Sequence, residues 1–190
     1  MKELGKKTIY IFLGASGSGK TTAGIYVKEN LNIPELISHT TRKPREGEID
    51  GYTYYYITRE EFPLIEKVES SNYSGEDLYC LSKQEAEEKL SKYDKVFIIA
   101  DIDGVKQIKD YYEDNSQVDV KVVYFDITLD LIEERMRKRG DSDEDIKKRL
   151  NKAIESKELE NGKYADYVLS HKFSLKELYT AITNIVNDEY

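Results

Sequence analysis

Two stretches of the chain combine residue types that bind phosphate. The first, GASGSGKTT, fits the pattern G-x-x-x-x-G-K-[ST] with Gly14, Gly19, Lys20 and Thr21. Glycines let the backbone curl until several N–H groups point into one concavity, where a polyphosphate meets the start of a helix. Lys20 can then reach the β- and γ-phosphates, and the Thr21 hydroxyl can be a ligand of Mg²⁺. The alternative is a flexible Gly/Ser turn that matches by chance. Because the stretch follows an apolar strand and opens a helix, we favour a nucleotide-binding loop.

The second stretch, SHTTRKPREGEIDGYTYYY, concentrates cations and phenol hydroxyls in residues 38–56. Arg42, Lys43 and Arg45 lie within four positions, and a proline and a glycine beside them mark a turn. These cations therefore lack the i,i+4 partners of a helix surface. A guanidinium donates two parallel hydrogen bonds to phosphate, whereas an ammonium acts as a point charge. We expect this loop to hold the phosphate of a second ligand.

A further arginine group lies in ERMRKRGDSDEDIKKR. A solvated surface with many neighbouring acids explains Arg137, and it is an alternative for Arg139. We expect the others, Arg135 and Arg149, to close over a γ-phosphate as part of a mobile lid that excludes water. A glycine loop with two arginine groups suits phosphoryl transfer, which depends mainly on positioning and on neutralising phosphate charge.

The composition limits the class of partner. The chain has 190 residues, 39% of them hydrophobic and 35% charged, as in a soluble protein of one domain. Its net charge of -8 argues against nucleic acid or an anionic membrane, because these need a net basic face. Cys80 is the only cysteine, which excludes an intrachain disulfide. No apolar run reaches the length of a signal peptide or a membrane span, so we expect a cytoplasmic protein.

Strand and helix patterns alternate along the chain, which predicts a parallel sheet with helices on both faces. Strands are expected at 8–13, 36–38, 54–57, 95–100, 120–125 and 167–169, and helices at 20–31, 82–92, 104–113, 128–139, 142–161 and after 174. The run KVFIIA predicts a central strand. Capping boxes are expected at Thr58–Glu61, before a weak helix, and at Ser82–Glu85 and Ser174–Glu177. The region from 38 to 81 is richer in loops and predicts an insertion at the edge of the sheet.

GASGSGKTT, SHTTRKPREGEIDGYTY and RMRKRGDSDEDIKKRL together resemble the guanylate kinase family, in order and at family-like spacing. The resemblance implies an α/β fold. That fold would comprise a P-loop NTPase core (1–37 and 82–190) with a parallel sheet flanked by helices, a helical lid at about 135–149, and a monophosphate-binding region at 38–81. It also implies ATP-dependent phosphorylation of GMP or dGMP, with Mg²⁺. The partners would be small-molecule nucleotides, and the protein would be a monomer or homodimer.

The resemblance also implies roles for individual residues. ATP would contact Gly14, Ala15, Ser16, Gly17, Ser18, Gly19, Lys20, Thr21 and Thr22, with His171 beside the adenine. The acceptor phosphate would contact Ser38, Arg42, Arg45, Tyr54 and Tyr79, and Glu69 would read guanine. Asp101 would orient Mg²⁺ with Thr21, and Lys20, Arg42, Arg135, Arg139 and Arg149 would be catalytic. Alternatives are a strand-end cap for Asp101, a solvated helix-end position for Glu69, and packing roles for Tyr52, Tyr55 and Tyr56.

The sequence departs from the family where the base should be read. The stretch EKVESSNYSGEDLYCLSK lacks the family's tryptophan, and the base-contacting Ser/Thr falls on Leu81. The first acid of the family's D/E-I-D falls on Ile99, or, with one gap, Asp101 and Asp103 match both acids. Two other hypotheses therefore stay open: a kinase with another phosphorylated acceptor, and a non-catalytic guanylate-kinase-like binding module.

Overall fold

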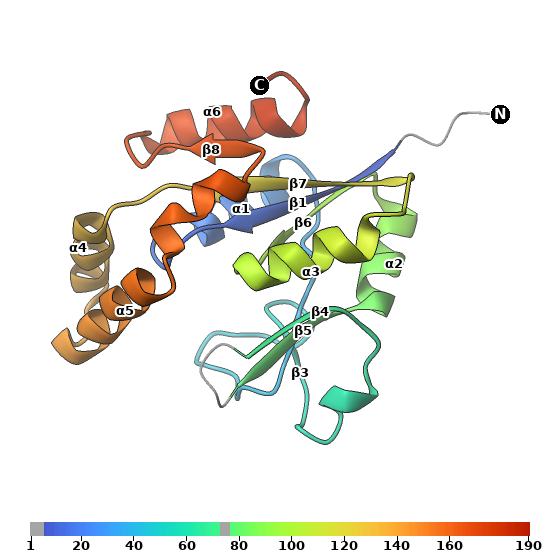
Figure 1. The fold of residues 1–190 in the computed structure, drawn as a ribbon, viewed down its shortest axis with the longest axis horizontal. Helices are drawn as coiled ribbons and strands as arrows, with labels where there is room; N and C mark the ends of the chain where they lie inside the picture. Colours follow the sequence, from blue (N-terminus) through green and yellow to red (C-terminus); the bar gives the residue numbers. More distant parts are fainter. Residues whose placement is uncertain (1–5, 73–76) are drawn as a thin grey trace.

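The computed structural model describes residues 6–72 and 77–190, so residues 1–5 of the expected core and 73–76 of the expected insertion lie outside the described residues. The core contains a parallel four-stranded sheet in the order β6-β1-β7-β8 (Figure 1). Its strands are β1 (Lys7–Leu13), β6 (Lys95–Ile99), β7 (Val118–Phe125) and β8 (Tyr167–Leu169). The expected α/β architecture is confirmed.

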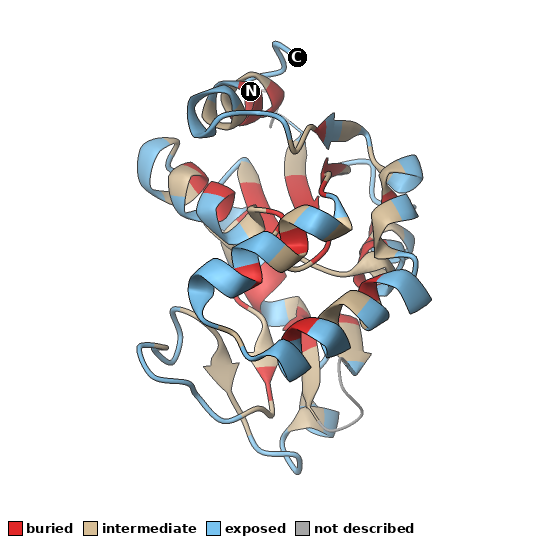
Figure 2. Cartoon of the chain, turned by 90° about the vertical axis from the view of Figure 1, so that its left-hand side faces the viewer, coloured by how far each residue is buried: buried red, intermediate tan, exposed pale blue. Residues whose placement is uncertain are grey.

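Helices cover both faces of this sheet. Side chains of successive residues point to opposite faces of a strand, and β1 accordingly places Ile9 and Ile11 in one buried cluster and Tyr10 and Phe12 in another. The first cluster packs against α2 (Lys83–Lys92) and α3 (Ile102–Tyr112), and the second against α1 (Lys20–Asn30) and α6 (Leu175–Val186). Figure 2 shows buried residues on the helix sides that face the sheet.

Strand β6 lies at an edge of the sheet, so its expected central position is wrong. Its outer side is covered by a short extended segment, in which Leu36 N donates to Phe97 O (2.7 Å) and Phe97 N donates to Pro34 O (3.0 Å). The strand expected at 36–38 reduces to one bridge, between Glu35 and Phe97. This cover buries the apolar run of β6 without a further full strand.

The insertion contains a second four-stranded sheet, in the order β3-β2-β5-β4. Its strands are β2 (His39–Thr40), β3 (Tyr55–Tyr56), β4 (Lys67–Asn72) and β5 (Leu78–Ser82). The antiparallel pair β4–β5 is not evident in the sequence, because KVESSN carries little apolar alternation. This sheet brings residues from both ends of the insertion side by side.

The weak helix expected after Thr58 is a single 3₁₀ turn, η1 (Phe62–Leu64). The capping box forms: Glu61 N donates to Thr58 Oγ1 (3.2 Å) and Thr58 N donates to Glu61 Oε2 (2.7 Å). Pro63 lacks a backbone donor, and the chain turns to extended geometry at Ile65. The capping hydrogen bonds therefore stabilise a turn that is not followed by an α-helix.

The segment expected to form the lid, at about 135–149, spans the end of α4 (Leu129–Arg139) and the first half of α5 (Asp143–Glu155), and the 3₁₀ turn η2 (Glu158–Tyr164) follows. Thr128 and Ser142 cap the two helices as expected, and Gly140 ends α4 with φ 88°. Helix α5 ends before the expected position near 161, because the chain turns through Lys157 with φ 51°. Within residues 6–72 and 77–190, no helix is long and apolar enough to span a bilayer.

Glu85 joins the insertion to the core. Ser82 caps α2 by accepting from Glu85 N (3.1 Å), but the Glu85 carboxylate does not complete the expected capping box. Its Oε1 instead accepts from Ile37 N (3.0 Å), and its Oε2 accepts from the Tyr55 hydroxyl (3.2 Å). The buried carboxylate thereby links α2, the chain entering the insertion, and β3.

Glu85→Ala leaves the Ile37 amide and the Tyr55 hydroxyl without their acceptor. We expect the free energy of unfolding, measured by urea titration, to fall by about 1–3 kcal/mol. Glu87→Ala is the matched control, because Glu87 lies on the same helix, is exposed, and forms a 4.0 Å ion pair with Lys83. Equal urea midpoints for the two variants would contradict the linking role.

Candidate functional site

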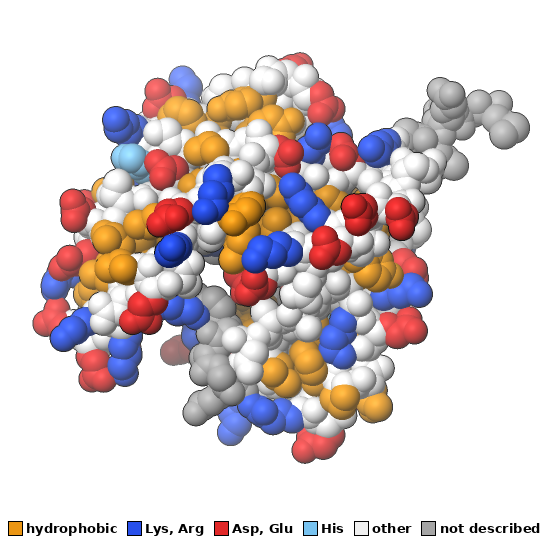
Figure 3. Space-filling model, in the orientation of Figure 1, with side chains coloured by type: hydrophobic (Ala, Val, Ile, Leu, Met, Phe, Trp, Pro, Cys, Tyr) orange, Lys and Arg blue, Asp and Glu red, His pale blue; other side chains and the backbone are white. Residues whose placement is uncertain are grey.

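A cleft of about 1590 Å³ is lined by the glycine loop after β1, the insertion, the start of α3 and the lid. Figure 3 shows this face of the molecule hollowed between the lid and the insertion, with acidic and basic side chains interspersed around it. Every acceptor-site residue expected from the sequence lines this cleft: Ser38, Arg42, Arg45, Tyr54, Glu69, Tyr79 and Asp101. The lid arginines Arg135, Arg139 and Arg149 line it from the other side.

The glycine loop leaves the start of α1 open toward the cleft. A Cβ at Gly14 would lie 2.7 Å from Phe125 O, so only glycine allows this close approach to β7. Gly19 starts α1 with φ 104°, and among the described residues no side chain caps the helix. The first N–H groups of α1 are therefore available to an anion, and the helix dipole favours one there.

The Lys20 ammonium is held inside the loop by backbone carbonyls. Its Nζ donates to Gly14 O (2.6 Å) and Ala15 O (2.9 Å). Burial lowers the pKa of Lys20 to about 8, because desolvation disfavours the charged form. A polyphosphate at the loop would stabilise that charge more strongly than neutral carbonyls do.

The lid touches the glycine loop through Arg135, whose Nη1 donates to Gly17 O (2.5 Å). Arg139 is paired with Asp141, with 3.0 Å between Nε and Oδ1. Arg137 points away into ion pairs with Glu133 and Asp143, as expected for a solvated surface. Only the cleft-lining lid arginines can therefore meet a phosphate held by the loop.

Arg42 is fixed by several acceptors before any ligand binds. Its Nε donates to the Tyr79 hydroxyl (3.2 Å), its Nη1 to Lys43 O (2.9 Å) and its Nη2 to Glu48 Oε1 (2.8 Å). The guanidinium carbon lies 5.5 Å from the centre of the Tyr54 ring. These contacts hold the fork toward the cleft with little side-chain entropy left to lose.

Glu48 is a site residue that sequence reasoning missed. Its Oε2 accepts from Arg45 N (2.7 Å) and from the Tyr56 hydroxyl (2.8 Å), while Oε1 accepts from Arg42. The hydrogen bond from Arg42 is the main reason why the pKa of Glu48 falls to about 2. The sequence feature that could have predicted this role is the position of Glu48, an acidic residue in the same turn as Arg42 and Arg45.

The remaining tyrosines of the second stretch have structural contacts. Tyr52 lies under Lys28 Nζ, which is 3.6 Å from the ring centre, Tyr55 bonds Glu85, and Tyr56 bonds Glu48. Tyr54, by contrast, lines the cleft edge-on to Tyr79, with ring centres 5.9 Å apart. One of the four tyrosines thus faces the ligand space.

A pair of carboxylates lies where β4 meets the start of α3. Glu69 is only 6% exposed and lies on a strand, so the alternative of a solvated helix-end glutamate is wrong. Asp101 caps α3, because its Oδ1 accepts from Gly104 N (2.8 Å). A Cβ at Gly104 would lie 3.4 Å from both Glu69 Oε2 and Asp101 Oδ1. Burial, and then the Asp101 charge, raises the pKa of Glu69 to about 7.

Known proteins identify the family to which this arrangement belongs. Residues 6–189 match the guanylate kinase family. The chain belongs to that family. It is 34% identical to a guanylate kinase of Fusobacterium nucleatum over 169 residues, covering 86% of this chain and 88% of that protein. It is also 34% identical to a guanylate kinase of Carboxydothermus hydrogenoformans over 186 residues, covering 95% of this chain and 86% of that protein.

A solved structure supports the fold. The crystal structure of guanylate kinase from Anaplasma phagocytophilum matches with a TM-score of 0.66 and 22% sequence identity, covering 100% of this chain and 88% of that one. At this identity the match supports the shared fold alone.

Two positions differ from what the guanylate kinase family led us to expect. Leu81, at the position of the base-contacting Ser/Thr, is fully buried opposite Glu69. His171, expected beside the adenine, lies outside the cleft lining, with its Nδ1 2.6 Å from Asp126 Oδ2. Phe173, which is two residues later, does line the cleft. Neither Leu81 nor His171 lines the cleft.

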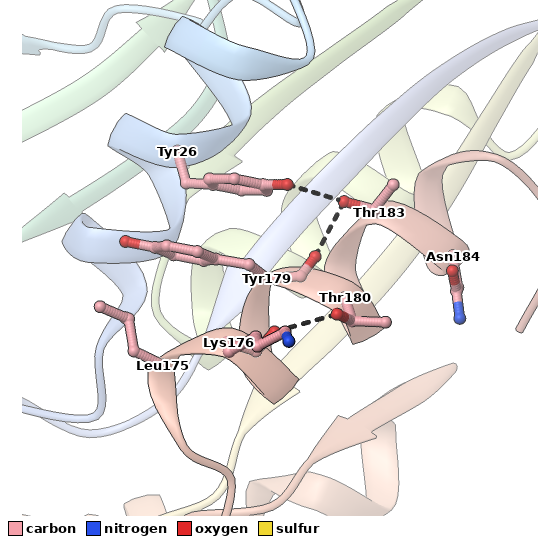
Figure 4. Close-up of a pocket in the computed structure, with 7 residues that line it drawn as sticks. All are labelled: Tyr26, Leu175, Lys176, Tyr179, Thr180, Thr183 and Asn184. Carbon is pink, nitrogen blue, oxygen red and sulfur yellow. Dashed lines mark hydrogen bonds between the residues drawn. The ribbon is translucent and has the colours of Figure 1, made fainter.

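A second pocket, of about 680 Å³, lies between α1 and α6 (Figure 4). The rings of Tyr26 and Tyr179 stack there with centres 3.9 Å apart, and the Tyr26 hydroxyl is 3.1 Å from Thr183 Oγ1. Figure 4 shows the two rings side by side, one from each helix. These contacts hold α6 on α1. The aromatic residues that line the pocket therefore serve to pack the two helices together.

Arg42→Ala removes the guanidinium that the insertion holds toward the cleft. If Arg42 binds and aligns the acceptor phosphate, as the sequence predicts, kcat/KM for the acceptor should fall by roughly 10²-fold, with both a higher KM and a lower kcat. Lys43→Ala is the control, since Lys43 is the neighbouring exposed cation. Steady-state kinetics measure both, and an unchanged kcat/KM in Arg42→Ala would remove Arg42 from the site.

Proposed function

We propose that the chain transfers the γ-phosphoryl group of ATP to GMP, giving ADP and GDP, with dGMP as a further acceptor. The observation that carries this proposal is one cleft with two phosphate-binding devices. An open helix start with Lys20 lies on one side, and Arg42 with its tyrosines lies on the other. The lid arginines line the same cleft. Family membership supports the same donor and acceptor.

The donor would bind with its β- and γ-phosphates at residues 14–22. Mg²⁺ keeps most of its waters and takes one or two protein ligands beside phosphate oxygens. Thr21 is exposed at the start of α1, and Asp101 faces the same cleft with one carboxylate oxygen used for capping. These donors fit Mg²⁺. When bound, the ion supplies charge neutralisation at the phosphate oxygens.

The acceptor would place its phosphate at Arg42, with Arg45, Ser38, Tyr54 and Tyr79 around it. A phenol hydroxyl donates a hydrogen bond without adding charge. Guanine presents N–H donors at N1 and N2, and Glu69 with Asp101 offers the carboxylate oxygens that accept such donors. Leu81 lies in the core, so these two carboxylates would carry the base recognition.

The chemistry needs little beyond positioning and charge. An acceptor phosphate oxygen attacks the γ-phosphorus, and the bond to the β–γ bridging oxygen breaks. Arg135, Arg139 and Arg149 would neutralise charge on the transferred group. Closure of the lid would exclude water, which otherwise hydrolyses the donor. Arg135 already bridges the lid and the loop, which supports such a closed arrangement.

A second candidate is the same transfer to another nucleoside monophosphate. The buried Leu81 favours it, because one expected base contact is absent from the cleft lining. A panel of GMP, dGMP, IMP, AMP and UMP at equal concentration separates the two candidates by kcat/KM.

We also propose that the protein acts in purine nucleotide metabolism in the cytoplasm. Its ligands would be small-molecule nucleotides, and it would be a monomer or a homodimer.

Lys20→Met tests the transfer itself. ADP should form only when GMP and Mg·ATP are both present, and Lys20→Met should lower kcat by at least about 10²-fold. ATP should raise the melting temperature of the wild type but raise that of Lys20→Met much less, because the loop has lost its cation. Lys28→Met, on the same helix but outside the cleft, serves as the control. If ATP stabilises the wild type but no GMP-dependent ADP forms, the transfer is excluded and the protein is a non-catalytic binding module.

The raised pKa of Glu69 predicts a pH-dependent acceptor KM. Guanine N–H groups bind the ionised carboxylate, so protonation below about pH 7 weakens binding. We expect KM for GMP to rise by about tenfold from about pH 8 to about pH 6. The phosphate of GMP also titrates near pH 6, so Glu69→Gln is measured in parallel. A profile equally steep in Glu69→Gln would assign the dependence to the phosphate.

A further inference from the structure

Helix α3 of the core binds the outer edge of the insertion sheet through one side chain. In the described part of the chain, β4 is the last strand of that sheet, and its free edge faces α3. Gln107 Oε1 accepts from Ser70 N (3.0 Å), and Gln107 Nε2 donates to Ser70 O (2.9 Å). The side-chain amide thus makes with Ser70 the two hydrogen bonds that a neighbouring strand would make.

Ser70 directly follows Glu69, the carboxylate that faces the cleft. Asp101, which caps α3, is followed at three-residue intervals by Gly104 and Gln107, so these residues lie along one side of the helix. Asp101 adds its charge beside Glu69, and Gly104 leaves room for the Glu69 carboxylate, which would lie 3.4 Å from a Cβ at that position. Gln107 fixes the backbone next to Glu69. One side of α3 therefore determines where the Glu69 carboxylate lies.

We propose that Gln107 is a positioning residue that sets the specificity of the cleft for the acceptor's base, by holding the Glu69 carboxylate at the height of the guanine N1 and N2 donors. This inference rests on the proposed function, since it names what selects the acceptor. Gln107 lies apart from both phosphate devices, so its effect falls on the base alone. Its planar amide is suited to the task, because its oxygen accepts from Ser70 N while its NH₂ group has two donors. One donates to Ser70 O, and Nε2 also donates to Asp103 O (3.2 Å) on its own helix.

The chemistry of the side chain limits what can replace it. Methionine has nearly the shape of glutamine but neither donates nor accepts strongly. In Gln107→Met, Ser70 N–H and C=O lose their partner, and β4 is free to shift along α3. A carboxylate that moves by a fraction of an ångström loses discrimination, because hydrogen-bond strength falls steeply with poor geometry.

The test compares GMP with IMP, which lacks the 2-amino group and therefore one donor to a carboxylate. For the wild type we expect kcat/KM to favour GMP strongly. In Gln107→Met the GMP:IMP ratio should fall by about tenfold, while KM for ATP stays within about twofold. Lys106→Met is the matched control, because Lys106 is the exposed neighbour on α3 and pairs with Asp103 on that helix (3.1 Å). Its GMP:IMP ratio should equal that of the wild type.

Two further variants keep the proposal testable if Gln107→Met folds poorly, as judged by its melting temperature. Gly104→Ala crowds the same carboxylate from the same helix without removing a hydrogen bond, and it should also lower the GMP:IMP ratio. In a Glu69→Gln background, adding Gln107→Met should change the ratio little, because the group that it positions is already altered. A full additional loss in the double variant would overturn the proposal.

The outcomes separate this inference from the proposed function. A folded Gln107→Met with a wild-type GMP:IMP ratio overturns the positioning role while the kinase activity stands. Equal losses with GMP, IMP and ATP show a purely structural role and overturn it as well. A wild type that phosphorylates GMP and IMP equally well removes the inference but keeps the transferase. A wild type that phosphorylates neither, although ATP stabilises it, removes the proposed function first.

Discussion

Cations held in fixed positions before a phosphate arrives are the constraint on which the site depends. An arginine or lysine that moved freely would lose much of its binding energy as side-chain entropy. The chain fixes three of the cleft cations with internal acceptors: loop carbonyls hold Lys20, Glu48 and Tyr79 hold Arg42, and Gly17 O holds Arg135. A phosphate can then bind cations whose positions are already fixed. The cations would therefore orient the phosphate for reaction as well as attract it.

The same constraint explains how the insertion is built. A small sheet at the edge of a parallel core must present Arg42 and Glu69 at fixed distances from the glycine loop. Glu85 ties β3 and the entering chain to α2, and Gln107 ties β4 to α3. Both tethers are polar side chains on core helices that bond to the insertion, mainly to its backbone. The proposed acceptor site is therefore shaped as much by the core as by the insertion.

Much of the fold could be predicted from local sequence. The apolar run of β1, the caps at Thr128, Ser142 and Ser174, and the glycine at the end of α4 each act within a few residues. The β4–β5 pair and the edge position of β6 could not be predicted in this way. Strand order and the pairing of polar strands depend on partners distant in the chain, and composition carries no record of those partners.

The sequence by itself determined the phosphate chemistry of this protein, because a glycine loop and clustered guanidiniums are local features whose residue types admit few other uses. Only the tertiary structure decided which carboxylates line the cleft, that Glu48 holds Arg42, and that His171 pairs with Asp126 outside the cleft. The physical reason is burial. Whether Glu69 is a solvated side chain or a desolvated one with a raised pKa depends on what packs around it, and α3 is brought there by the fold.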